Sequence, residues 1–262
     1  MSSSTSSSSS SSSAQTFARP AVYSGGRQGA KPYQEDSFFS WCSPTNRVIV
    51  GGVLDGHGGY NGLMASNTAK ETALAYLQKN ETVCETWSED EWIKRLEELF
   101  DILHSEIRDV FLKAPPNPPL QNFSNAKPQV TTEKRYTDDK GIVRNANADP
   151  IHGGTTASIV VMIQEDNGAA ATIITANVGD STALLIPTKG TWDFLSVDHG
   201  PENADEWGRV NASAESTQFE TKLLFVYDKT NVFRKYECPC VFLPDGTKDQ
   251  QYVANPWGYG KK

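Results

Sequence analysis

The stretch VIVGGVLDGHGG, residues 48–59, holds a short apolar run that ends abruptly in one acidic residue and several glycines. Such a run, β-branched and bounded by turn formers, is typical of a strand, which we expect over residues 47–54. A second strand is expected just before it, over residues 38–41. Asp55 then falls where a strand ends, a position at which active-site groups are often presented. By itself, the sequence that follows the strand is first of all that of an ordinary turn.

Three neighbouring groups at this strand end can bind a cation or transfer a proton. A carboxylate such as that of Asp55 prefers water unless an opposite charge pairs with it. Gly56 has no side chain, so its backbone carbonyl can approach and ligate a cation. His57 can donate a proton near neutral pH. These groups suit a cation site with proton transfer, but taken alone the Asp-Gly-x-Gly pattern is more often an ordinary turn.

A second acidic pair, Glu35-Asp36, precedes the first expected strand. Alone it reads as a solvated surface pair. If it met Asp55 in space, three carboxylates would repel one another strongly unless cations were bound. Clusters of this kind bind Mg²⁺ or Mn²⁺.

The clearest helix of the sequence follows Ser88, which forms a capping-box pattern with Glu91. Pro115 and Pro116 end it. Another helix is expected over residues 62–79. In the helix after Ser88 the apolar positions recur at steps of three and four: Trp92, Leu96, Leu99, Leu103, Ile107 and Val110.

Strand signals return after residue 155. We expect strands over residues 157–163, 170–177 and 183–186, with the last two joined as a hairpin by the turn at residues 178–181. Strand and helix blocks that alternate, with hairpins as well as crossovers, favour an α+β layered domain.

The composition narrows the choice of partners. The chain of 262 residues carries 24 Lys and Arg against 32 Asp and Glu, a formal net charge of −8. Negative charge repels nucleic acid and anionic lipid, so we expect neither as a partner. No apolar run reaches the length of a membrane span and no secretory signal is visible. We therefore expect a cytoplasmic or nuclear protein. A monomer is expected as well.

The ends and the middle of the chain differ in character. Residues 1–17 are Ser-rich and predict a disordered tail, followed by one folded domain over residues 18–262. Residues 114–150 are rich in Pro, Asn, Asp and Lys and predict an irregular insertion. The cysteines show no disulfide spacing, and no second Cys/His pair lies near Cys238 and Cys240 to complete a metal site. We therefore expect free thiols at Cys42, Cys84, Cys238 and Cys240.

Five short motifs follow one another along the chain, with a sixth stretch downstream. They are Gln34-Glu35-Asp36, Asp55-Gly56-His57-Gly58-Gly59, Gly154-Thr155-Thr156-Ala157, Asn177-Val178-Gly179-Asp180-Ser181 and Asp198-His199-Gly200-Pro201, with Glu206-Trp207-Gly208-Arg209 downstream. Any one of them would be a weak signal, but their common order is specific and spans residues 31–209. In this order they resemble the motifs of the PPM-type (type 2C) metal-dependent serine/threonine protein phosphatases.

The resemblance implies an α-β-β-α sandwich, two packed antiparallel sheets with helices on both outer faces. It implies hydrolysis of phosphoserine and phosphothreonine on protein substrates by a water that bridges two Mg²⁺ or Mn²⁺ ions. Asp55, Gly56 and Glu35 would ligate the metals and Asp36 would support them. His57 would protonate the leaving oxygen. The other motifs are expected to be structural.

The sequence also departs from the family pattern. Lys31 stands where the family has a phosphate-binding Arg, and supplies charge without the bidentate fork. The late metal-binding Asp motifs of the family have no counterpart before Lys262, so we expect a domain that is truncated at its C-terminal side. Two alternatives to an active enzyme follow: a phosphatase-like module that binds a phosphorylated partner without turnover, and a non-functional fragment.

Overall fold

The computed structural model describes residues 21–28, 33–113, 134–165, 170–199, 205–206 and 209. The chain divides into two compact units, Met1–Asn177 and Val178–Lys262. Several predictions fall outside the described residues: those on the tail of residues 1–17, on Lys31, on residues 114–133 of the insertion, and on Cys238 and Cys240.

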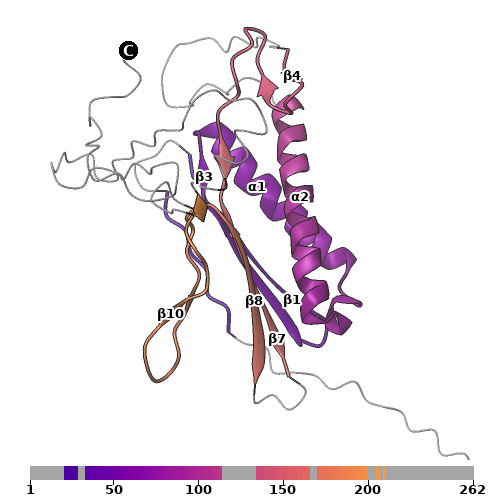
Figure 1. The fold of residues 1–262 in the computed structure, drawn as a ribbon, viewed down its shortest axis with the longest axis vertical. Coiled ribbons are helices and arrows are strands. Elements are labelled where there is room, and N and C mark those ends of the chain that lie inside the picture. Colours follow the sequence, from indigo (N-terminus) through magenta and orange to yellow (C-terminus); the bar gives the residue numbers. More distant parts are fainter. Residues whose placement is uncertain are drawn as a thin grey trace, which may run out of the picture. The chain divides into compact units, whose positions relative to one another are not determined.

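A four-stranded sheet forms the centre of the first unit (Figure 1). Its order is β1 (Ser37–Cys42), β2 (Val48–Leu54), β7 (Ala157–Gln164) and β8 (Ala171–Val178). β2 pairs antiparallel with β1 and with β7. The strands predicted from the apolar runs are thereby confirmed, and β2 lies in the interior of the sheet, as its continuous apolar sequence requires.

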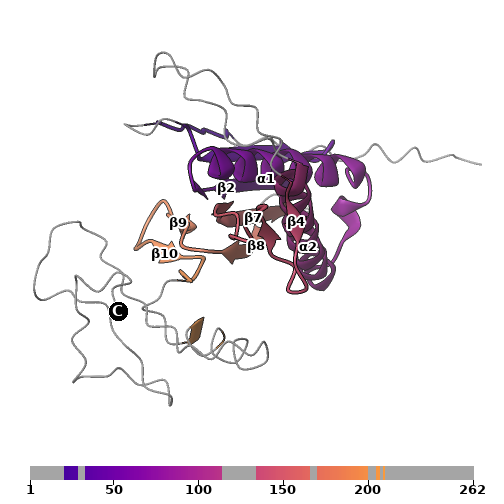
Figure 2. The same cartoon turned by 90° about the horizontal axis from the view of Figure 1, so that it is seen from above.

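Two long helices cover one face of this sheet (Figures 1 and 2). α1 spans Tyr60–Lys79 and α2 spans Glu89–Lys113, with the short 3-10 helix η1 (Cys84–Thr86) between them. The backbone N–H of Glu91 donates to Ser88 Oγ at 3.2 Å, so the predicted N-terminal cap of α2 is present. Both predicted helices are confirmed.

The core lies between the helices and the sheet. It combines alternate strand residues with the apolar stripe of α2, as the two periodicities demand. Each large apolar side chain buried here stabilises the fold by about 1.5–3 kcal/mol. The core residues with least exposure include Val48, Val50, Leu54, Leu77, Cys84, Trp92, Leu99, Ile159 and Val161.

The opposite face of the sheet is only partly covered, since Val53 is 52% exposed and Phe38 is 36% exposed. Helices on an antiparallel sheet confirm the α+β class. The remaining strands of the described ranges form only two-stranded pairs, so the second sheet of the expected sandwich stays a prediction.

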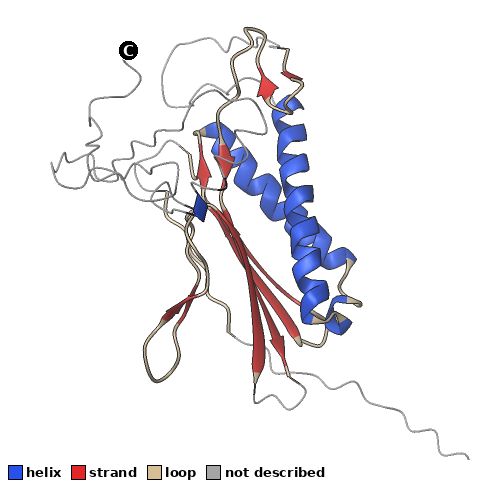
Figure 3. Ribbon diagram, in the orientation of Figure 1, coloured by secondary structure: helices blue, strands red, loops and turns tan. Residues whose placement is uncertain are grey.

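Shorter strand pairs complete the described structure (Figure 3). Within the expected insertion, β4 (Tyr136–Thr137) and β5 (Val143–Arg144) form a hairpin, and Arg135 donates to the Phe111 carbonyl of α2 at 2.8 Å. In the second unit, β9 (Leu184–Leu185) pairs with β10 (Asp193–Phe194). The predicted hairpin partner of residues 183–186 was therefore wrong.

None of the helices in the described ranges combines the length and the apolar character that crossing a bilayer would require. Cys42 and Cys84 are free thiols, as expected.

Candidate active site

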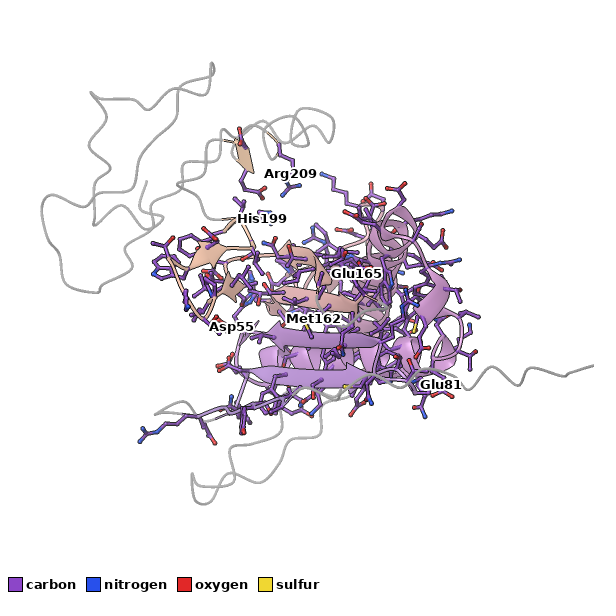
Figure 4. The ribbon with its side chains drawn as sticks, turned by 90° about the horizontal axis from the view of Figure 1, so that it is seen from below. Asp55, Glu81, Met162, Glu165, His199 and Arg209 are labelled. Carbon is purple, nitrogen blue, oxygen red and sulfur yellow. The ribbon has the colours of Figure 1, made fainter. Side chains whose placement is uncertain are left out.

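Asp55 is the residue that directly follows β2, at one end of the sheet, with Glu165 toward the other end (Figure 4). Its backbone is held on both sides by one residue of the neighbouring strand segment. The Asp55 N–H donates to Thr156 Oγ1 at 3.0 Å, and the Thr156 N–H donates to the Asp55 carbonyl at 2.9 Å. This clamp fixes the backbone while Asp55 itself stays exposed.

The next two residues form β3 (Gly56–His57), which pairs antiparallel with β6 (Gly154–Thr155). His57 is exposed and its ring lies against the backbone of the opposite strand. A Cβ added to Gly154 would lie 3.2 Å from His57 Cε1 and 3.4 Å from Nε2. The imidazole therefore packs against the backbone of Gly154, which has no side chain to keep the ring away.

Glu35 is a buried carboxylate at the N-terminus of α1. Its Oε2 accepts a hydrogen bond from the Gly59 N–H at 2.7 Å, and its backbone carbonyl accepts one from Ser66 Oγ at 2.5 Å. The first turn of α1 has no acidic residue of its own. A carboxylate at this position is favoured by the unsatisfied N–H groups and the dipole of the helix.

Glycine backbones bring the two predicted stretches together. We call residues 34–36 the acidic segment and residues 55–59 the glycine loop. A Cβ added to Gly62 of α1 would lie 2.6 Å from the His57 nitrogen and 2.8 Å from Glu35 Oε2. The acidic segment, the glycine loop and the first turn of α1 therefore pack in direct contact, at a separation only glycine permits.

Asp36 differs from Glu35 in exposure, because burial alternates along this extended segment. Glu35 and Ser37 are buried, whereas Asp36 is exposed and lies near Gln34, whose Nε2 is 3.3 Å from Asp36 Oδ2. The structure thus brings Glu35 and the glycine loop together and leaves the Asp36 side chain on the outside.

The donor set of this site suits a hard divalent cation in part. Glu35, Asp55 and the Gly56 carbonyl offer oxygen ligands, the type that Mg²⁺ and Mn²⁺ prefer. Across the described ranges, no group of three or more His, Cys, Asp or Glu side chains is placed to hold a metal ion. These residues would form one portion of a ligand set that needs further oxygen donors.

The motif residues from Val178 onward lie in the second unit, and those that the structure describes make structural contacts there. The His199 N–H donates to the Gly179 carbonyl at 3.0 Å, and Thr182 Oγ1 donates to Asp198 at 3.3 Å. The hydrogen bonds from Arg209 hold the pKa of the Glu206 carboxyl below its ordinary value.

A cavity of about 470 Å³ lies between α2 and β8, with no residue of the acidic segment or the glycine loop among its described lining. Its walls are mainly apolar, with two acidic side chains on the helix side. The residues that line it are Ile93, Leu96, Glu97, Phe100, Asp101 and Ile174 to Asn177.

Two residues of the site were not assigned a role from the sequence. Thr156 was treated as a packing residue, yet it clamps Asp55 from 101 positions away. Asn61, on α1, donates from Nδ2 to the His152 carbonyl at 2.7 Å, across 91 positions. The only sequence signal for Thr156 is its place in the third of the motifs that resemble the family, and no sequence signal pointed to Asn61.

The protein phosphatase 2C family model matches residues 92–226, slightly more than half of the chain, and the chain belongs to this family. The matched range includes the motifs from Gly154 to Arg209, whereas the acidic segment and the glycine loop precede it. No curated protein matches the sequence.

Proposed function

We propose that this protein is a metal-dependent phosphatase that hydrolyses phosphoserine and phosphothreonine on proteins. Membership of the protein phosphatase 2C family supports the reaction class. The observation that carries the assignment of the site is the contact between the acidic segment and the glycine loop, through the 2.7 Å hydrogen bond from Gly59 to Glu35.

Each residue has a proposed role in this reaction. Asp55, Glu35 and the Gly56 carbonyl would hold the cations, with Asp36 in support and Lys31 binding the substrate phosphate. The oxygen of water bonds to phosphorus and the water releases a proton to solvent. The bond from phosphorus to the Ser or Thr oxygen breaks, His57 gives a proton to that leaving oxygen, and solvent then restores the proton of His57. His57 suits this role because it is exposed and its ring rests on Gly154.

Two bound Mg²⁺ or Mn²⁺ ions would lower the pKa of the attacking water and neutralise the charge of the phosphate. The chain's own contribution is to fix the place of the donors. The Thr156 clamp holds Asp55, and the N-terminus of α1 holds Glu35.

Hydrolysis of a phosphothreonine peptide tests this proposal. The protein should release phosphate when Mn²⁺ is present and lose that activity when EDTA removes the metal. Asp55→Asn should lower kcat about 100-fold or more, because one charge of the site is lost while its shape is kept. The matched control is Asp139→Asn, which makes the same change at an exposed position of the β4–β5 hairpin. Activity that persists in EDTA and survives Asp55→Asn would contradict this mechanism.

A second function, a module that binds phosphorylated proteins without turnover, is favoured by one observation. Within the described part of the chain, no three acidic or His side chains gather as a metal cluster. Calorimetry with Mn²⁺ separates the two functions. Tight binding of two ions supports the enzyme, whereas weak binding at one site, together with phosphopeptide binding and no release of phosphate, supports the module.

A further inference from the structure

Asn61 connects the start of α1 to the segment that supports His57. It is the second residue of the helix, and its Nδ2 donates to the His152 carbonyl at 2.7 Å. His152 immediately precedes Gly153 and Gly154, and Gly154 is the residue on which the His57 ring rests. The hydrogen bond therefore holds the residue directly before Gly153 and Gly154, the two glycines that lie beside the glycine loop.

The same segment is wedged between Asn61 and the glycine loop. Gly153 has φ +136°, and a Cβ added to it would lie 2.6 Å from Asn61 Cβ. A Cβ added to Gly58, which has φ +103°, would lie 2.7 Å from Gly153 Cα. These close contacts leave no room for a side chain at Gly58 or Gly153, and the hydrogen bond from Asn61 fixes the position of this backbone segment between its neighbours.

Stability alone does not account for Asn61. Within the described residues its Oδ1 is buried and has no hydrogen-bond partner. A buried acceptor without a donor destabilises the folded state, and such a group in a native protein calls for an explanation.

We propose that Asn61 is a positioning residue for the His57 imidazole, acting through the His152–Gly154 backbone; this rests on the proposed function, in which His57 protonates the leaving oxygen. Loss of the Asn61 hydrogen bond lets residues 152–154 shift, and Gly154 then no longer supports the ring where the proton is needed. Catalysis that depends on the proton is lost, whereas binding of the substrate is kept.

Substrates with different leaving groups test this role. A threonine alkoxide needs a proton as it leaves, whereas 4-nitrophenolate leaves readily without one. In Asn61→Ala, kcat on a phosphothreonine peptide should fall about 10- to 100-fold. On 4-nitrophenyl phosphate, kcat should fall less than about threefold, with KM for both substrates little changed. A purely structural defect would lower both activities equally.

Two further variants keep the test clear of folding effects. Asn61→Asp keeps the side-chain shape and adds a negative charge where the helix dipole favours one, so α1 is retained while the donor is lost. Asn80→Ala is the matched control. Like Asn61, Asn80 donates from Nδ2 to a backbone carbonyl, but its acceptor is Tyr76 of α1, at 2.8 Å. Asn80→Ala should leave the ratio of the two activities unchanged.

Proton NMR provides a readout that does not need activity. A nuclear Overhauser effect between the His57 Hε1 and the Gly154 Hα protons should be present in the wild type and in Asn80→Ala, and lost in both Asn61 variants. Equal loss of activity on both substrates, or retention of this effect in the Asn61 variants, overturns the positioning role. Absence of activity in the wild type overturns the proposed function instead, and the NMR comparison still decides the role of Asn61.

Discussion

The two ends of α1 are packed in opposite ways. At the C-terminal end, which we call the core end, Leu77, Cys84 and Trp92 are buried, and Trp92 packs edge-on against Trp87 at a centroid distance of 4.8 Å. At the N-terminal end, which we call the site end, glycines let the α1 backbone, the glycine loop and residues 152–154 touch directly. The core end is packed by large side chains, whereas the site end is packed by backbone contacts at glycines.

This difference separates stability from function. Burial of side chains at the core end stabilises the fold in proportion to the apolar area removed from water. Backbone contacts at the site end contribute less apolar area, but they fix Asp55, His57 and Glu35 within a small space. Changes at the core end should therefore alter stability first, and changes at the site end should alter catalysis first.

The largest expected effect on stability is at the core end. Trp92→Ala should lower the free energy of unfolding by about 3–5 kcal/mol, because a fully buried aromatic side chain leaves a cavity. Urea denaturation measures the loss, and activity per folded molecule should be unchanged. Ile93→Ala, at the adjacent and 45% exposed position, is the control and should cost less than about 1 kcal/mol. Equal losses in the two variants would contradict the packing described here.

At the site end, Gly58→Ala should cost about 2–4 kcal/mol and most of the catalytic activity. The cost combines backbone strain at φ +103° with a collision 2.7 Å from Gly153 Cα. Gly141→Ala isolates the strain, since Gly141 has φ +79° and no atom within 4 Å of the added Cβ. It should cost about 1–2 kcal/mol and leave activity intact. An active Gly58→Ala protein would break the comparison between the two ends.

The dependence of stability on alkaline pH tests whether the Cys84 thiol at the core end is shielded from water. Burial raises the pKa of Cys84 from its ordinary value of 9.0 to about 12. Between these values the unfolded chain loses the thiol proton and the folded protein keeps it, so stability falls as pH rises from 9 towards 12. The thiol should contribute a slope of up to about 1.4 kcal/mol per pH unit. The difference between wild type and Cys84→Ala in urea titrations isolates it, and identical slopes would show that water reaches Cys84.

The smallest expected effect on stability comes from Thr156. Thr156→Val removes the hydroxyl that accepts the Asp55 N–H, and should cost about 1 kcal/mol. Activity should fall much further than stability, because the clamp fixes the metal-ligand candidate Asp55. Thr156→Ser keeps the hydroxyl and should restore activity in a malachite-green phosphate assay. If Thr156→Val is as active as the serine variant, the clamp has no functional role.

Local patterns in the sequence predicted the core end well. Ser88 and Glu91 marked the start of α2, and its apolar stripe from Trp92 onward gave the buried face. β2 was recognised because its continuous apolar run suits an interior strand. These elements are determined by residues close together in the chain, so periodicity and capping suffice.

Long-range and weak elements escaped prediction. β4 and β5 are two residues each, too short for any alternation to register. The predicted pairing of β9 was wrong, because a turn at residues 178–181 is compatible with more than one pairing of the strand that follows it. Asn61 reaches a carbonyl 91 positions away, and no local pattern announces such a contact. The meeting of Glu35 with the glycine loop was expected only as a condition for metal binding.

Titration of Mn²⁺ by isothermal calorimetry into the wild type, Glu35→Gln, Asp55→Asn and the double variant tests the central claim most directly. If both carboxylates serve one metal centre, each single variant weakens binding about 10-fold or more, and the double variant is little worse than the weaker single one. Glu35→Gln keeps an oxygen that accepts the Gly59 N–H, so folding is preserved. Unchanged Mn²⁺ affinity in either single variant, or losses that add independently, would contradict a shared metal centre.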